Sequence, residues 1–141
     1  MPQFHKTERI TSLKEIEHLF ERGRSSSIQI MPLRAIYQLR PAEAEGKSEP
    51  AIKVLVSVAK KRLRHAVDRN RVKRQVREAF RLQHQPLSDA LLSLGKRMHI
   101  AFVWLSDTPA ATNDVFEAMK EILDSIEEKY APPKTEKRVI E

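Results

Sequence analysis

The chain has 141 residues, of which 40% are hydrophobic, so it can form one domain with a modest buried core. It contains no cysteine, which excludes a disulfide framework, a thiolate nucleophile and a cysteine-based zinc site. The net charge is +7, no apolar run approaches the ~20 residues of a membrane span, and residues 1–8 lack a signal-peptide core. We therefore expect a cytoplasmic protein with no membrane partner.

The excess positive charge lies in one segment, residues 60–81. This segment holds ten Lys or Arg residues and two acidic ones, a net charge of +8, whereas the other 119 residues carry 16 basic and 17 acidic residues. Charge concentrated in this way indicates a polyanionic partner, because each cation that meets a phosphate releases counterions. A face that is merely solvated normally mixes signs, and Glu78 is the only acid in 69–81.

The first part of the chain predicts one helix and two strands. A capping box opens a helix over 12–22, and Gly23 can end it. Residues 26–40 have strand character, and Pro32, which cannot donate to a ladder, divides them or marks an edge. A polar loop follows over 40–51.

The rest of the chain predicts two apolar strands, a basic connection and three helices. The strands cover 52–58 and 98–105, and the basic connection covers 59–66. The helices cover 68–84, 87–94 and 113–129. In the first of them the apolar spacing i, i+4, i+7, i+8 predicts a buried stripe of Val72, Val76, Ala79 and Phe80. The opposite face gathers Asn70, Arg74, Arg77 and Arg81, flanked by Arg71 and Lys73.

The element order is α-β-β-β-α-(α)-β-α, which predicts an α/β (α+β) sandwich with a small sheet of about four strands. Strands 52–58 and 98–105 are joined through helices, so they should run parallel. One domain is expected over 1–130, followed by a disordered tail over 131–141.

The sequence offers no catalytic or metal-binding constellation of its own. The histidines are scattered, none at ligand spacing with another His or an acid, and Ser57 has no neighbours that would activate a nucleophile. Phe20 and Tyr37 fit two interpretations, core packing or a cleft on which bases stack.

Residues 59–81 closely resemble the signature of the bacterial ribonuclease P protein subunit. The match centres on the RNR motif, Arg69-Asn70-Arg71-x-Lys73-Arg74-x-x-Arg77-Glu78, and extends over about 4–128. Further matching stretches are Lys6-Thr7-Glu8-Arg9-Ile10, Leu19-Phe20-Glu21-Arg22-Gly23, Tyr37-Gln38-Leu39 and Val56-Ser57-Val58.

The resemblance implies a ribonucleoprotein subunit that promotes removal of the 5′ leader of precursor tRNA, while the RNA subunit performs the hydrolysis with Mg²⁺. It implies a fold like the second domain of ribosomal protein S5, with a left-handed βαβ crossover, and a monomeric protein in a one-protein, one-RNA complex. Contacts to the RNA subunit would come from Arg69, Asn70, Arg71, Lys73, Arg74, Arg77 and Arg81. A leader cleft would be formed by Ile16, Phe20, Tyr37, Ser57, Lys60 and Lys61. Additional basic contacts would come from Lys6, Arg9, Arg62 and Arg64.

The chain departs from the family pattern in two places. Many members have an aromatic residue where Ile16 stands, and many have Lys or Arg where Ser106 and Asp107 follow the last strand.

Two other classes of function use the same basic helix. One is a ribosomal or general RNA-binding protein without an enzyme partner. The other is a DNA-binding regulator, which is disfavoured because a strand, not a helix and short turn, precedes the basic segment.

Overall fold

The computed structural model describes residues 25–41 and 51–130. Its four strands are β1 (Ser26–Ile30), β2 (Leu33–Pro41), β3 (Ile52–Ser57) and β4 (Lys96–Trp104). Its helices are α2 (Ala66–Gln83), α3 (Gln85–Ser93) and α4 (Thr112–Tyr130). For this part of the chain the predicted order of elements is confirmed, with boundaries that differ by one or two residues. The predicted helix 12–22 and tail 131–141 lie outside the described residues.

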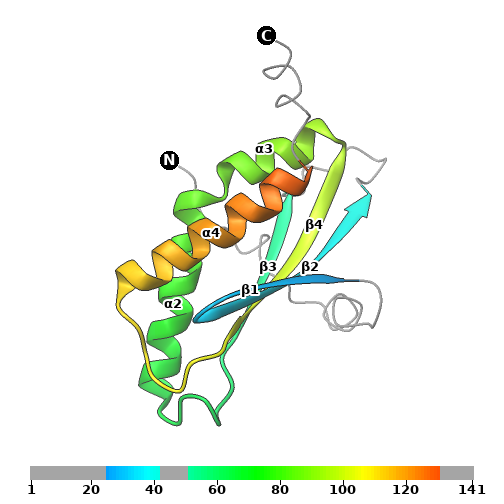
Figure 1. The fold of residues 1–141 in the computed structure, drawn as a ribbon. Helices are drawn as coiled ribbons and strands as arrows, with labels where there is room; N and C mark the ends of the chain where they lie inside the picture. Colours follow the sequence, from blue (N-terminus) through cyan, green and yellow to red (C-terminus); the bar gives the residue numbers. More distant parts are fainter. Residues whose placement is uncertain (1–24, 42–50, 131–141) are drawn as a thin grey trace.

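The strands form one mixed sheet in the order β1-β2-β4-β3 (Figure 1). β1 and β2 are an antiparallel hairpin that turns at Met31 and Pro32, so Pro32 divides the predicted strand as expected. β2 also pairs antiparallel with β4, and β3 pairs parallel with β4. The parallel crossover predicted from the intervening helices is therefore confirmed.

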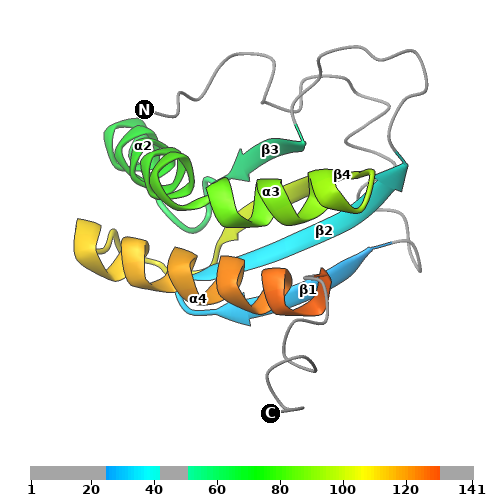
Figure 2. The same cartoon turned by 90° about the horizontal axis from the view of Figure 1, so that it is seen from above.

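The crossover from β3 to β4 has the less common hand. It runs through α2 and α3, which lie with α4 on one face of the sheet (Figure 2). With the helices in front and both strands pointing upward, β4 lies to the left of β3, which makes the crossover left-handed (Figure 2). The usual right-handed rule would have given the wrong topology here, whereas the family resemblance gave the correct one.

The core fills the space between the sheet and the three helices. Alternate strand residues point toward the helices, because successive side chains of a strand point to opposite faces. The sheet contributes Leu33, Ala35, Tyr37, Ile52, Val54, Val56, Met98, Ile100, Phe102 and Trp104, all buried. The helices contribute Val72, Val76, Ala79, Phe80, Leu87, Leu91, Val115, Met119, Ile122, Leu123 and Ile126.

Two glutamines fasten α2 to α4. The Gln75 side-chain amide donates to the Ala110 carbonyl at 3.2 Å and to the Thr112 hydroxyl at 2.9 Å. About two helical turns further along α2, the Gln83 side-chain amide donates to the Phe116 carbonyl at 3.0 Å. These bonds and the apolar stripe fix the rotation of α2 about its axis, so its basic side faces away from the core.

Candidate nucleic-acid interface

The outer side of α2 presents the basic residues of the RNR motif. Asn70, Arg71 and Arg74 are exposed, whereas Lys73 and Arg77 are half-buried. On the opposite side Val72, Val76 and Phe80 have no exposed surface, and Ala79 is almost fully buried. The predicted division of this helix into a core stripe and a basic face is confirmed.

Arg69 has a structural role at the start of this helix. Its Nη1 donates to the Leu63 carbonyl and to the Arg64 carbonyl, each at 2.9 Å. Both acceptors belong to the connection between β3 and α2, so the guanidinium holds that connection against the first turn of the helix. The sequence assigned Arg69 only to RNA contacts, and this second role had no visible signal in the residue spacing.

Arg69→Ala should therefore loosen the connection between β3 and α2. We expect a loss of about 1–2 kcal/mol in the free energy of unfolding, because two backbone carbonyls lose a charged donor. Urea denaturation measures the loss, and faster amide exchange at Arg62 and Leu63 locates it. Arg74→Ala is the matched control, since Arg74 is exposed and its removal should cost less than about 0.5 kcal/mol. Equal effects of the two variants would contradict the structural role.

Arg81, at the other end of the basic face, is paired with an acid of the same helix. Its Nε donates to a Glu78 carboxylate oxygen at 3.0 Å, and its Nη2 donates to the other carboxylate oxygen. This hydrogen bonding holds the pKa of the Glu78 carboxyl below its usual range. The Glu78 carboxylate therefore offsets part of the charge of Arg81 toward an RNA partner.

The connection between β3 and α2 is an ordered turn that presents cations. The Ala59 carbonyl accepts from the backbone amides of Arg62 and Leu63, and the Leu63 side chain is buried. Lys60, Lys61 and Arg64 are exposed at this turn. Their backbone is thus fixed by hydrogen bonds and one apolar anchor, while their charged groups remain accessible.

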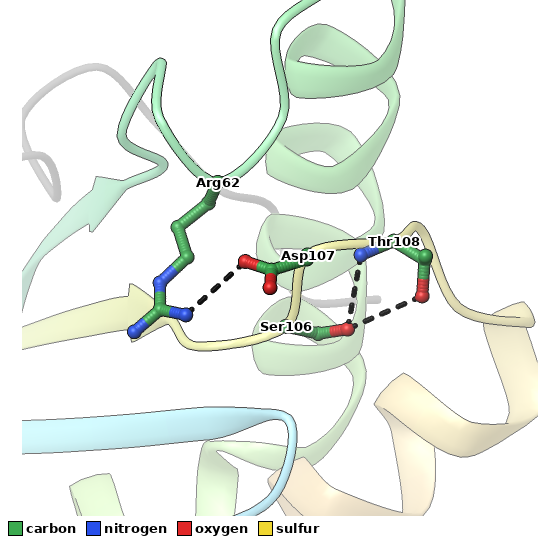
Figure 3. A network of polar contacts seen from close by, with 4 residues as sticks. All are labelled: Arg62, Ser106, Asp107 and Thr108. Atoms are coloured by element: carbon green, nitrogen blue, oxygen red, sulfur yellow. Dashed lines mark hydrogen bonds and ion pairs between the residues drawn. The ribbon is translucent and has the colours of Figure 1, made fainter.

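Arg62 reaches from this turn to the loop that follows β4. Its Nη1 lies 3.2 Å from a carboxylate oxygen of Asp107, and Ser106 and Thr108 form a small hydrogen-bonded turn beside it (Figure 3). The two segments are 45 residues apart in the sequence. Asp107, which departs from the family pattern described above, thus pairs with Arg62, one of the predicted RNA contacts.

The sheet face turned away from α2, α3 and α4 combines an apolar strip with polar margins. Leu55, Ala101 and Ile36 lie side by side across three strands and pack together. One neighbouring row contains Ser57, Val103 and Arg34, and the other contains Lys53, His99 and Gln38. Ala101, His99 and Gln38 are themselves buried, so the accessible part of this face includes the row of Ser57, Val103 and Arg34.

Tyr37 does not belong to this surface. It pairs in register with Ile100 and lies on the helix side of the sheet, where it is 6% exposed. The Lys129 ammonium of α4 sits 5.7 Å from the centre of its ring. The expectation that Tyr37 and Ser57 line one cleft is corrected, because their side chains point to opposite faces of the sheet.

Four predicted contacts, Lys6, Arg9, Ile16 and Phe20, lie outside the described residues. Among residues 25–41 and 51–130, no group of three or more His, Cys, Asp or Glu side chains is placed to hold a metal ion. Within the same ranges no helix is both long and apolar enough to cross a membrane.

A family model described as Ribonuclease P matches residues 4–127. The chain belongs to the ribonuclease P protein family. It is thus a protein component of the ribonucleoprotein endonuclease that carries out 5′ maturation of tRNA, which implies association with ribonuclease P RNA.

Two kinds of relative support this membership of the ribonuclease P family. The ribonuclease P protein component of Porphyromonas gingivalis is 41% identical over 118 residues, which cover 84% of this chain and 82% of the relative. The ribonuclease P proteins of Staphylococcus aureus and Thermotoga maritima have similar structures, each with a TM-score of 0.61 and 18% identity. These two matches cover 84% of this chain and 94% and 96% of the respective structures, and they show that the fold is shared.

Proposed function

We propose that this ribonuclease P protein uses two surfaces for two RNAs. The basic face of α2 binds the RNA subunit, and the sheet face turned away from α2, α3 and α4, with the turn after β3, holds the 5′ leader of precursor tRNA. RNA-subunit contacts are assigned to Arg69, Asn70, Arg71, Lys73, Arg74, Arg77 and Arg81. Leader contacts are assigned to Ser57, Lys60 and Lys61, with Arg62 and Arg64 as additional basic contacts.

The observation that carries this proposal is the separation of the two surfaces within one fold. The α2 face is a row of cations without exposed aromatic or apolar neighbours over 69–77, which fits phosphates at fixed spacing. On the sheet face turned away from α2, the exposed Arg34 lies in the same row as Ser57, and the exposed Lys60 and Lys61 follow Ser57 along the chain, which fits a single strand. The ordered turn at Ala59 connects the two.

The protein's contribution is electrostatic and positional. We assign the hydrolysis to the RNA subunit and its Mg²⁺ ions, as the resemblance to the ribonuclease P protein family implies. Cations on α2 reduce the repulsion between the two RNA backbones, and this should lower the Mg²⁺ concentration that the complex needs. We assign the protein to the cytoplasm, as a monomer in a one-protein, one-RNA complex that acts on precursor tRNA.

The absence of cysteine allows a direct test of the leader surface. A photoreactive group attached to Ser57→Cys should crosslink to the leader of bound precursor tRNA, because Ser57 lies at the edge of the apolar strip. The matched control is Ser125→Cys, which is exposed on α4. Crosslinks at equal yield from both positions, or from Ser125→Cys alone, would contradict the assignment.

A further inference from the structure

The ion pair between Arg62 and Asp107 joins two loops at the same end of the sheet (Figure 3). The Arg62 side chain is 37% exposed and the Asp107 side chain is 75% exposed. An ion pair this exposed adds little to stability, because water screens it. Its consequence is geometric, since it fixes the direction of a long side chain that would otherwise sample many rotamers.

The pair leaves part of the Arg62 guanidinium available to a ligand. Only Nη1 contacts Asp107, and a guanidinium carries five N–H donors on two usable edges. Lys61, Arg62 and Asp107 together line a pocket of about 250 Å³. A phosphate oxygen in this pocket can accept from the remaining Arg62 donors and from the Lys61 ammonium without displacing Asp107.

We infer that Asp107 is a positioning residue. It holds Arg62 beside Lys61 so that the two cations form a binding site for one RNA backbone phosphate. This inference rests on the proposed function and deepens it, since it assigns a role to an acid that pairs with one of the predicted RNA contacts. The phosphate belongs to the leader of precursor tRNA or to the RNA subunit.

A positioning role for Asp107 predicts the opposite of what the change in net charge alone predicts for RNA binding. Removing Asp107 raises the net charge by one, and a field effect alone would tighten RNA binding. If Asp107 positions Arg62, Asp107→Ala should instead weaken binding by about threefold to fivefold, the range that an exposed ion pair can supply. The dependence of log K on log salt should also become shallower by somewhat less than one unit, because one phosphate contact is lost.

The experiment measures two affinities over a range of salt. One arm titrates ribonuclease P RNA with the protein, and the other titrates the assembled complex with leader-bearing precursor tRNA. The variants are Asp107→Ala, Asp107→Glu, Arg62→Ala and the double Arg62→Ala, Asp107→Ala variant. The matched control is Asp124→Ala, which removes an acid from an exposed ion pair with Lys120 on α4.

We expect Asp107→Ala to weaken binding in one arm, which identifies the RNA that supplies the phosphate. Asp107→Glu keeps the carboxylate and should stay closer to wild type. The double variant should be no weaker than Arg62→Ala alone, and Asp124→Ala should bind as tightly as wild type or slightly better. Unchanged or tighter binding of Asp107→Ala in both arms would overturn the inference. Failure of the wild-type protein to bind ribonuclease P RNA would instead overturn the proposed function.

Discussion

Replacing Arg71 and Arg74 together with glutamate should weaken binding to ribonuclease P RNA by about 100-fold at moderate salt. Both side chains are exposed on the outer side of α2, and a 100-fold loss corresponds to about 1.4 kcal/mol of binding free energy for each of the two phosphate contacts. Two lost contacts should also reduce the slope of log K against log salt by about two units. Filter binding or fluorescence anisotropy at several salt concentrations measures both quantities.

The control for this variant changes the same charge elsewhere. Lys96→Glu combined with Lys120→Glu reverses two exposed cations on β4 and α4. We expect this control to retain most of the affinity, with a salt slope close to that of the wild type. Both double variants should unfold at a urea concentration near that of the wild type, because substitutions at exposed positions seldom change stability by more than about 0.5 kcal/mol. If the control loses as much affinity as the α2 variant, then net charge and not the α2 face governs binding.

Phe80→Ala should destabilise the fold by about 3–5 kcal/mol, the usual cost of truncating a fully buried aromatic side chain. The Phe80 ring has no exposed surface, stacks on His84 at 4.9 Å between ring centres, and meets Phe102 at 5.9 Å. It therefore connects α2 to the start of α3 and to β4. For a domain whose total stability is about 5–15 kcal/mol, this is a large fraction.

The measurement is chemical or thermal unfolding, with Leu82→Ala as the control. Leu82 is on the same helix but is 43% exposed, so its truncation should cost much less than that of Phe80. Saturating ribonuclease P RNA should raise the unfolding midpoint of Phe80→Ala, because a ligand that binds only the folded state stabilises it. A small loss for Phe80→Ala, similar to that for Leu82→Ala, would mean that α2 is not anchored through this ring.

The elements of this fold could be predicted because the sequence repeats its apolar residues at clear periods. The spacing from Val72 to Phe80 determines which side of α2 is buried, and the apolar runs in β3 and β4 identify two buried strands. The hand of the crossover could not be predicted this way, since periodicity contains no information on chirality. It followed from the resemblance alone.

Only part of the candidate site could be predicted. The resemblance did not show which face of the sheet a residue occupies, and the sequence did not show which distant segments meet. Tyr37 was assigned to the same leader cleft as Ser57, but a match of sequence stretches does not say which face of the sheet a residue occupies, and an offset of one position reverses it. The pairing of Arg62 with Asp107 spans 45 residues and depends on how two loops meet. Arg69 reaches back to the carbonyls of residues 63 and 64, a contact that has no characteristic spacing.

The central claim is that this chain assists a catalytic RNA, and reconstitution tests it most directly. The cognate ribonuclease P RNA is assayed for cleavage of precursor tRNA at low Mg²⁺, with and without the protein. We predict that the protein increases the rate of correct 5′ cleavage, and that the Arg71→Glu, Arg74→Glu variant at the same concentration does not. Cleavage that is equally slow with and without the wild-type protein would contradict the account.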